Sequence, residues 1–450
     1  MAGVSSKDLL RMAGWPLGIA NRPPEEAMPT DEDGNVLALR AAKNIDIDDQ
    51  GKPRRRPGGE LALAAEGLHS LWAHDRFPLM LGVHAGDVVA FDPSEDMEAL
   101  GASLERPNQP MSYDVLAGNV YASNGWDKLQ IRGDGTVRSW AAECPGGQPL
   151  AVISPGVGGL RQGKYQVAVT FIDVDGREGG ASLPVELELA AGDGITLTNF
   201  PVAQDPRTAI MRVYLSHPDS DVLYAVQDLA LSTSSYLVGM HTPGGKLDKL
   251  FLAPMPAGQI VRAVNGRQIV ACGRLLRWSP ALTYGLTILH RAFQRYDAEL
   301  TLVEPAGQAE GSGLFVATAA GDGKRAGRTY YLTGPDPANW QRVIAYPHGA
   351  VRGSATQIDA SALGLEQSGL VPVWLSDHGQ FVIGLRGGQV MELHADRYAA
   401  PAHADHASIA LREFGGVRHL IATLRGGQVS GMAAVDLAEA EVWKNGERIS

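Results

Sequence analysis

The sequence predicts an all-β fold: a β-propeller of about six blades, interrupted by an inserted fibronectin III- or immunoglobulin-like β-sandwich and preceded by an extended N-terminal arm. Three observations predict it. The 54 glycines and 27 prolines exceed their usual share of a 450-residue chain, which indicates many turns and short strands. From about residue 66 onward, short apolar segments alternate with turn residues. The hexapeptide LRGGQV begins at Leu385 and again at Leu424, 39 residues later, close to the roughly 40 to 50 residues of one blade.

Residues 66–150 and 246–435 are predicted to supply the blades. The stretch 79–93 (LMLGVHAGDVVAFDP) indicates two strands and a tight turn, and 118–140 repeats the pattern. Similar stretches follow at 265–279, 313–334, 371–396 and 414–429. A small antiparallel sheet cannot bury both of its faces alone, so sheets arranged around an axis cover one another and leave only short edges. Residues 436–450 are expected to form a C-terminal hairpin or tail.

Residues 151–245 differ in character and predict the inserted sandwich, because many short strands in about ninety residues favour two packed sheets. One expected strand places four side chains on the same face: Tyr165, Val167, Val169 and Phe171. A turn follows at Asp175 and Gly176, and the whole resembles the central hairpin of fibronectin type III domains. The acidic, glycine-rich stretch around this turn lacks the register of a calcium loop.

The one concentrated basic run of this acidic chain, GKPRRRPGG, lies in the predicted arm, residues 1–65; the formal net charge is −11. Pro53 and Pro57 enclose Arg54, Arg55 and Arg56 and favour an extended backbone. Because the arginine fork binds carboxylates bidentately, we expect the run to lie against an acidic surface of its own propeller or of a neighbouring subunit. Local carboxylates of this kind are offered by Asp46, Asp48 and Asp49. A merely solvated run is the alternative, and three arginines are too few for a DNA-binding surface.

Residues 14–58 resemble a known family. A Gly-Ile segment with prolines leads into LRAAKNIDIDD, then Gly51 and RRRPG. This order resembles the amino-terminal segment of phage head-to-tail proteins, namely the tail nozzle or tail-tubular protein B of short-tailed phages and the related phage stabilisation proteins. The later stretches GRLLRWSPALTYG, SGLFVATAAG, YYLTG and VWLSDHGQFVIGLRGGQV are similar to these proteins too.

The resemblance implies a structural protein of the virion tail, synthesised in the host cytoplasm. It implies a homo-oligomeric ring, expected as a hexamer, through which DNA is ejected without specific binding and to which adaptor, fibre or spike proteins attach. No membrane partner is expected. An acidic lumen would repel phosphate, although acidity also serves plain solubility. The expected subunit-interface residues are Arg54, Arg55, Arg56 and Pro57, with Asn21, Arg22 and Asn44 carried over from the resemblance.

No catalytic residue, metal or cofactor is expected. Cys144 and Cys272 form no C-x-x-C motif, which fits a reducing compartment, and hydrolase motifs such as G-x-S-x-G are missing. His394, His403 and His406 gather near Pro401, which favours a loop between blades over a metal site. One alternative stays open: a receptor- or glycan-binding propeller on the virion surface, or a glycan-cleaving one whose paired carboxylates come from distant blades. Such a protein would have a deep axial pocket lined by aromatic residues.

Overall fold

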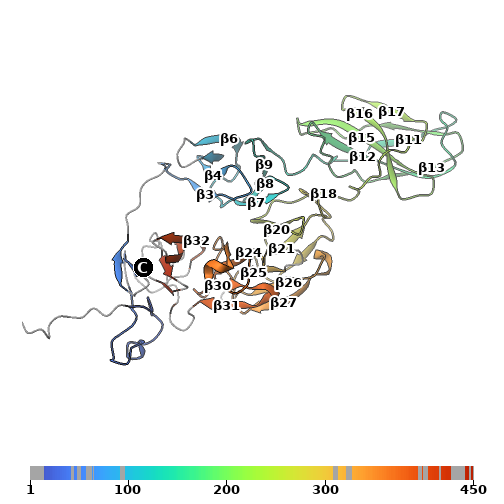
Figure 1. Ribbon diagram of the computed structural model, residues 1–450. Helices are drawn as coiled ribbons and strands as arrows, with labels where there is room; N and C mark the ends of the chain where they lie inside the picture. Colours follow the sequence, from blue (N-terminus) through green and yellow to red (C-terminus); the bar gives the residue numbers. More distant parts are fainter. Residues whose placement is uncertain are drawn as a thin grey trace, which may run out of the picture. The chain divides into compact units, whose positions relative to one another are not determined.

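The computed structural model shows an all-β fold built mainly from four-stranded antiparallel sheets (Figure 1). It describes residues 15–41, 45–47, 52–56, 63, 65–91, 97–307, 313–320, 327–393, 398, 404–414, 417–426, 441–444 and 447–448. Helical structure in these ranges is limited to short 3₁₀ turns, η1 (Glu25–Ala27), η2 (Pro337–Asn339), η3 (Ala360–Leu363) and η4 (Arg386–Gly388). No helix among them is long and apolar enough to cross a bilayer.

Six of the described sheets contain four strands in chain order, which is the meander of a propeller blade. The first three blades comprise β3 (His69–Trp72), β4 (Met80–His84), β5 (Asp87–Phe91) and β6 (Glu98–Ser103); β7 (Ser112–Leu116), β8 (Asn119–Ser123), β9 (Lys128–Ile131) and β10 (Val137–Arg138); and β19 (Ile260–Val264), β20 (Arg267–Cys272), β21 (Leu275–Trp278) and β23 (Phe293–Arg295). Two further short strands, β18 (Ala253–Pro254) and β22 (Leu286–Thr287), pair with each other. In the chain, β18 precedes the third blade and β22 lies between its strands β21 and β23.

The last three blades comprise β24 (Leu300–Pro305), β25 (Leu314–Thr318), β26 (Thr329–Thr333) and β27 (Gln341–Tyr346); β28 (Thr356–Asp359), β29 (Leu370–Leu375), β30 (Phe381–Gly384) and β31 (Val390–Leu393); and β32 (His406–Phe414), β33 (Val417–Arg425), β34 (Glu441–Lys444) and β35 (Glu447–Arg448). The segment expected as a C-terminal hairpin therefore forms the two outer strands of the sixth blade. These six sheets confirm the predicted fold class, an all-β propeller of about six blades.

The chain divides into two compact units. The sandwich-bearing unit consists of Ala65–Cys272 and Leu276–Gln294, and the terminal unit of Met1–Ala64, Gly273–Leu275 and Arg295–Ser450. Within the first unit, one core joins the first and second blades through Leu81, Val83, Tyr113, Val120 and Ile131. A second core joins the second and third blades through Tyr121, Trp140, Val261 and Val270. Successive blades therefore bury each other's faces, as the propeller prediction requires.

The terminal unit repeats this packing. Phe315 of the fourth blade and Trp374 of the fifth are fully buried, with ring centroids 5.5 Å apart. Another core contains Val373 and Phe381 of the fifth blade and Leu420 of the sixth. The inner strands of a blade are covered on both faces by neighbouring structure. In the fourth blade, β25 is therefore buried at every position, whereas the outer strand β27 is mostly exposed.

Tight turns set the register of several blade hairpins. Ala85 and Gly86 between β4 and β5 both have positive φ, and so do Ala117 and Gly118 between β7 and β8. Two central residues with positive φ form the type I′ turn, whose twist matches that of the flanking strands. The glycine at the second position adopts this conformation without the clash that a Cβ would cause.

The inserted sandwich is confirmed by seven strands in two sheets. One sheet has the order β11 (Leu150–Ser154), β14 (Gly194–Thr198), β17 (Ser235–Val238); the other has the order β13 (Val185–Leu189), β12 (Gly163–Asp173), β15 (Thr208–Ser216), β16 (Leu223–Ala230). The four residues predicted to share a face of β12 are all buried in the core between the sheets. The predicted turn is present, with Gly176 at φ 76°.

Candidate functional site

The predicted basic run forms the edge of a small ribbon. β1 (Ile45–Ile47) pairs antiparallel with β2 (Pro53–Arg55), so the backbone of the run is extended, and Asp46 lies opposite Arg54. Arg54 and Arg55 are exposed, whereas Arg56 is partly buried. Pro57 and Asn44, two further expected interface residues, lie outside the described residues.

Asp46 ties this ribbon to the sixth blade. Its Oδ1 accepts a hydrogen bond from Nε of Arg56 at 3.3 Å, and its Oδ2 accepts one from Arg412 of β32 at 3.3 Å. The Asp46 side chain is only 12% exposed, so both ion pairs are shielded from water. Arg56 therefore pairs with Asp46, one of the carboxylates of its own chain that the sequence suggested. Arg54 and Arg55 are exposed.

The segment around Asn21 and Arg22 also lies on the terminal unit. Ile19 is buried in the core of the fifth and sixth blades and forms a parallel bridge with Leu39. Nη2 of Arg22 lies 3.5 Å from Nε2 of His378, in the turn before β30. This part of the arm packs on its own unit.

The inserted sandwich is joined to the second blade by what we call the sandwich anchor, the loop Asp173–Arg177 with its contacts. Arg177 Nε donates to Asp173 Oδ2 at 2.7 Å, and its Nη1 donates to Gln130 Oε1 and to the carbonyl of Ser139, each at 3.0 Å. Asp173 is 5% exposed. One arginine thus satisfies a buried carboxylate of the sandwich and a side chain and backbone carbonyl of the blade.

Asp175 of the same loop binds a second group of arginines. Arg138 of β10 donates to its Oδ2, and Arg207 of the sandwich donates to the same oxygen at 2.6 Å. The hydrogen bond from Arg138 is the main cause that lowers the pKa of Asp175, and Arg207 adds to the effect. The acidic loop that resembled a calcium site in composition is therefore neutralised by arginine.

A third contact lies at the same end of the sandwich, where Thr208 of β15 pairs with Asp173 of β12. The carboxylate of Glu143, just before β11, accepts hydrogen bonds from the backbone N–H of Gln204 and Asp205 at 2.9 Å and from the Thr208 hydroxyl at 3.0 Å. Gly180 lies so close to the backbone of Leu252 that a Cβ added at Gly180 would lie 2.0 Å from the Leu252 carbonyl oxygen. These contacts hold the sandwich against the segment that connects the second blade to it and against the segment that leaves it.

The outer face of the three-stranded sheet differs from the rest of this charged protein. Neither β11, β14 nor β17 contains a charged residue. Leu150 and Val152 are 55% and 50% exposed, and Leu237 is 42% exposed. Val152 and Leu237 both pair with Thr196 of the middle strand, so the three form one row across the sheet. We call this surface the uncharged face; the opposite sheet carries charged residues on each of its four strands.

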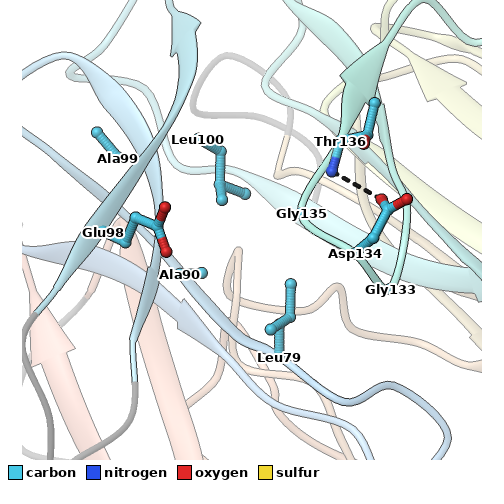
Figure 2. Close-up of a pocket in the computed structure, with 9 residues that line it drawn as sticks. All are labelled: Leu79, Ala90, Glu98, Ala99, Leu100, Gly133, Asp134, Gly135 and Thr136. Atoms are coloured by element: carbon cyan, nitrogen blue, oxygen red, sulfur yellow. Dashed lines mark hydrogen bonds between the residues drawn. The ribbon is translucent and has the colours of Figure 1, made fainter.

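A shallow pocket lies between the first and second blades (Figure 2). Its volume is about 400 Å³, and it is lined by Leu79, Ala90, Glu98, Ala99, Leu100, Gly133, Asp134, Gly135 and Thr136. The Asp134 carboxylate accepts a hydrogen bond from the backbone N–H of Thr136 at 3.0 Å. No aromatic residue lines this pocket, which lies between two blades and is therefore not the axial pocket expected for the glycan-cleaving alternative.

The histidines and cysteines give no metal site in the described part of the chain. His406 lies in β32, while His394 and His403 fall outside the described residues. No group of three His, Cys, Asp or Glu side chains among the described residues could hold a metal ion. Cys144 and Cys272 are free thiols; burial raises the pKa of Cys272 to about 11, which keeps it unreactive at neutral pH.

No family model and no curated protein matches the chain. Solved structures with some likeness include the N-terminal domain of Nup159 (10% identity, TM-score 0.28, covering 79% of this chain and 73% of that one). BBS1N in complex with ARL6DN is 8% identical, with a TM-score of 0.32 and coverage of 83% and 91%. The AfRom2 CNH domain is 6% identical, with a TM-score of 0.26 and coverage of 79% and 91%. Likeness of this degree carries no conclusion about function.

Sequence reasoning missed the sandwich anchor and the uncharged face. Arg177 stood beside Asp173 and Asp175 in the sequence, but its partners Gln130 and Ser139 lie about forty residues earlier. A signal for the uncharged face was present in the sequence, because the segments 150–154, 194–198 and 235–238 contain no charged residue. Their position on one sheet, however, depends on a strand order that the sequence does not display.

Proposed function

We propose that this protein is a structural component of a bacteriophage tail, assembling as a ring through which DNA passes. The uncharged face of the sandwich carries the proposal. Three apolar side chains, those of Leu150, Val152 and Leu237, are exposed on this face, and exposed apolar side chains gathered on one face are typical of contact between proteins. The chain has a net charge of −11, so two copies repel each other over most of their surfaces. At the uncharged face an acidic neighbouring subunit meets no side chain of like charge.

The firm mounting of the sandwich supports the same role. A tail subunit must transmit position between its neighbours, and a module that swings freely cannot. The sandwich anchor and the Glu143 contacts join the sandwich to the second blade by buried or partly buried ion pairs and hydrogen bonds. In this proposal the blades form the ring wall, and the uncharged face binds another tail subunit.

Charging the uncharged face is expected to prevent assembly without unfolding the protein. In the double variant Val152→Lys and Leu237→Lys, both side chains are already exposed, so the folded monomer should retain its stability within about 0.5 kcal/mol. Mass photometry and negative-stain images should show rings for the wild-type protein and separate subunits for the variant. Val202→Lys is the control, because Val202 is 75% exposed but lies outside the three strands. A wild-type protein that stays monomeric at micromolar concentration, with no partner bound to this face, would contradict the proposal.

The basic run gives a second prediction, because its three arginines have different surroundings. Arg54→Ser together with Arg55→Ser should change monomer stability by less than about 1 kcal/mol, because both side chains are exposed, and should weaken ring formation, because in this proposal they contact another subunit. Arg56→Ser should lower the free energy of unfolding by about 1 kcal/mol, because it removes a shielded ion pair with Asp46. Urea denaturation and mass photometry measure the two effects. Unchanged assembly in the double variant would exclude the run as a subunit contact.

A further inference from the structure

An exposed tryptophan, Trp126, lies on the second blade, outside the strands that form the uncharged face. The side chain of Trp126 is 50% exposed. It lies in the loop between β8 and β9 of the second blade, in the sandwich-bearing unit. Exposing so large an apolar side chain to water is unfavourable, so a loop that holds one outward suggests a binding role.

The loop holds Trp126 in one position. The buried Asn124 side chain accepts hydrogen bonds from the backbone N–H of Trp126 at 3.0 Å and of Asp127 at 2.7 Å. Its amide donates to Asp127 Oδ2 at 2.9 Å, and the Ser123 hydroxyl donates to the Asp127 carbonyl at 2.8 Å. Because the loop is already ordered, a ligand that stacks on the indole would lose little affinity to loop ordering.

A second connection, between β6 and β7, brings a cation to the same place. Asp127 accepts the backbone N–H of Glu105 at 2.9 Å and that of Arg106 at 3.1 Å. Burial acts to raise the pKa of Asp127, but the hydrogen bonds from Glu105, Asn124 and Arg106 outweigh it and the pKa lies below its usual value. Arg106 is thereby positioned with its guanidinium 5.8 Å from the centroid of the Trp126 ring.

We propose that Trp126 and Arg106 form a binding site for an acidic polysaccharide, in which a sugar ring stacks on the exposed part of the indole and its carboxylate pairs with the guanidinium. The apolar face of a pyranose fits a rigid indole, and the arginine fork fits a carboxylate. This inference goes beyond the proposed assembly role and does not depend on it.

The surroundings of the indole favour a saccharide over the other ligands of an exposed tryptophan. The core of a protein interface is depleted of Asp and Glu, yet Asp127 follows Trp126 directly and its carboxylate is held in the same loop. Single-stranded nucleic acid needs a cationic groove with a series of aromatic rings on which successive bases stack, whereas this site offers one arginine, Arg106, over one ring, that of Trp126. A sugar polymer needs one stacking surface and a few fixed polar groups, which this site supplies.

The test measures binding of the full-length protein to alginate, a polyuronate, and to dextran, a neutral glucan, by affinity electrophoresis and biolayer interferometry. The wild-type protein should bind alginate, more weakly at high salt, and bind dextran less well. Trp126→Ala should weaken alginate binding about tenfold, while Trp126→Phe retains most of it because an aromatic face remains. Arg106→Gln should remove the salt dependence and the preference for alginate.

Arg277→Gln is the matched control, since Arg277 also lies over an aromatic ring, that of Phe293 at 5.3 Å, in the same unit. It should leave alginate binding unchanged. The proposal is overturned if the wild-type protein binds neither polymer, or if Trp126→Ala and Trp126→Phe bind alginate as the wild-type protein does. Loss of self-association in Trp126→Ala with polysaccharide binding intact would assign the site to a protein partner and overturn the proposal too. Ring formation by mass photometry reports separately on the assembly role.

Discussion

Replacing Arg177 by leucine is expected to lower the free energy of unfolding of the sandwich-bearing unit by about 3 kcal/mol. The substitution leaves the carboxylate of Asp173, 5% exposed, without its cation, and leaves Gln130 and the Ser139 carbonyl without a donor from Arg177. Removing one partner of a buried ion pair costs more than the pair contributes, because the remaining charge stays away from water. Urea denaturation followed by tryptophan fluorescence measures the change.

A double-mutant cycle separates two contributions to the loss of stability: the unpaired, buried carboxylate of Asp173 and the lost packing of the Arg177 side chain. Asp173→Asn in the Arg177→Leu background should recover part of the stability, since no buried charge is then unpaired. Arg212→Leu is the control: Arg212 pairs with Asp228 at 2.6 Å, but their side chains are 32% and 43% exposed, so the loss should stay below about 1 kcal/mol. A loss for Arg177→Leu no larger than for Arg212→Leu would remove the sandwich anchor as a stabilising contact.

The second large effect is expected for Gly180→Ala, which should destabilise the protein by about 3 kcal/mol. The new Cβ would lie 2.0 Å from the Leu252 carbonyl oxygen and 3.1 Å from Sγ of Cys144. The nearest atom belongs to the backbone, so relief requires the connection between β12 and β13, which contains Gly180, to move away from the chain at Leu252 that leaves the sandwich. The hydrogen bond from the Gly180 N–H to Cys144 Sγ, 3.1 Å long, would be lost with that movement.

Thermal unfolding and the rate of Cys144 modification by a thiol reagent measure this change together. The thiol of Cys144 has its pKa raised, chiefly by burial, and should react slowly in the wild-type protein and faster in Gly180→Ala. Gly146→Ala is the control, because a Cβ at that position meets no atom within 4 Å. If Gly180→Ala is as stable as Gly146→Ala, the two chain segments are not in tight contact.

The LRGGQV repeat illustrates how a correct fold prediction can rest on a misleading signal. Its first copy follows β30, the third strand of the fifth blade, whereas Leu424 of the second copy lies in β33, the second strand of the sixth. The two copies therefore occupy different positions in their blades. Glycine-rich turns can close any hairpin, so their recurrence indicates hairpins and does not measure the blade period.

Local chemistry by itself determined the strands and turns of this protein. The alternation at Tyr165 to Phe171 predicted a buried strand face, and the prolines around Arg54 predicted extended backbone, because side-chain period and φ restriction act within a few residues. Only the tertiary structure decided that Asp46 also binds Arg412 of the sixth blade, that Arg177 joins the sandwich to the second blade, and that three uncharged strands share one sheet. Those contacts join residues distant in sequence, and they depend on strand order and blade packing, which no short stretch of sequence specifies.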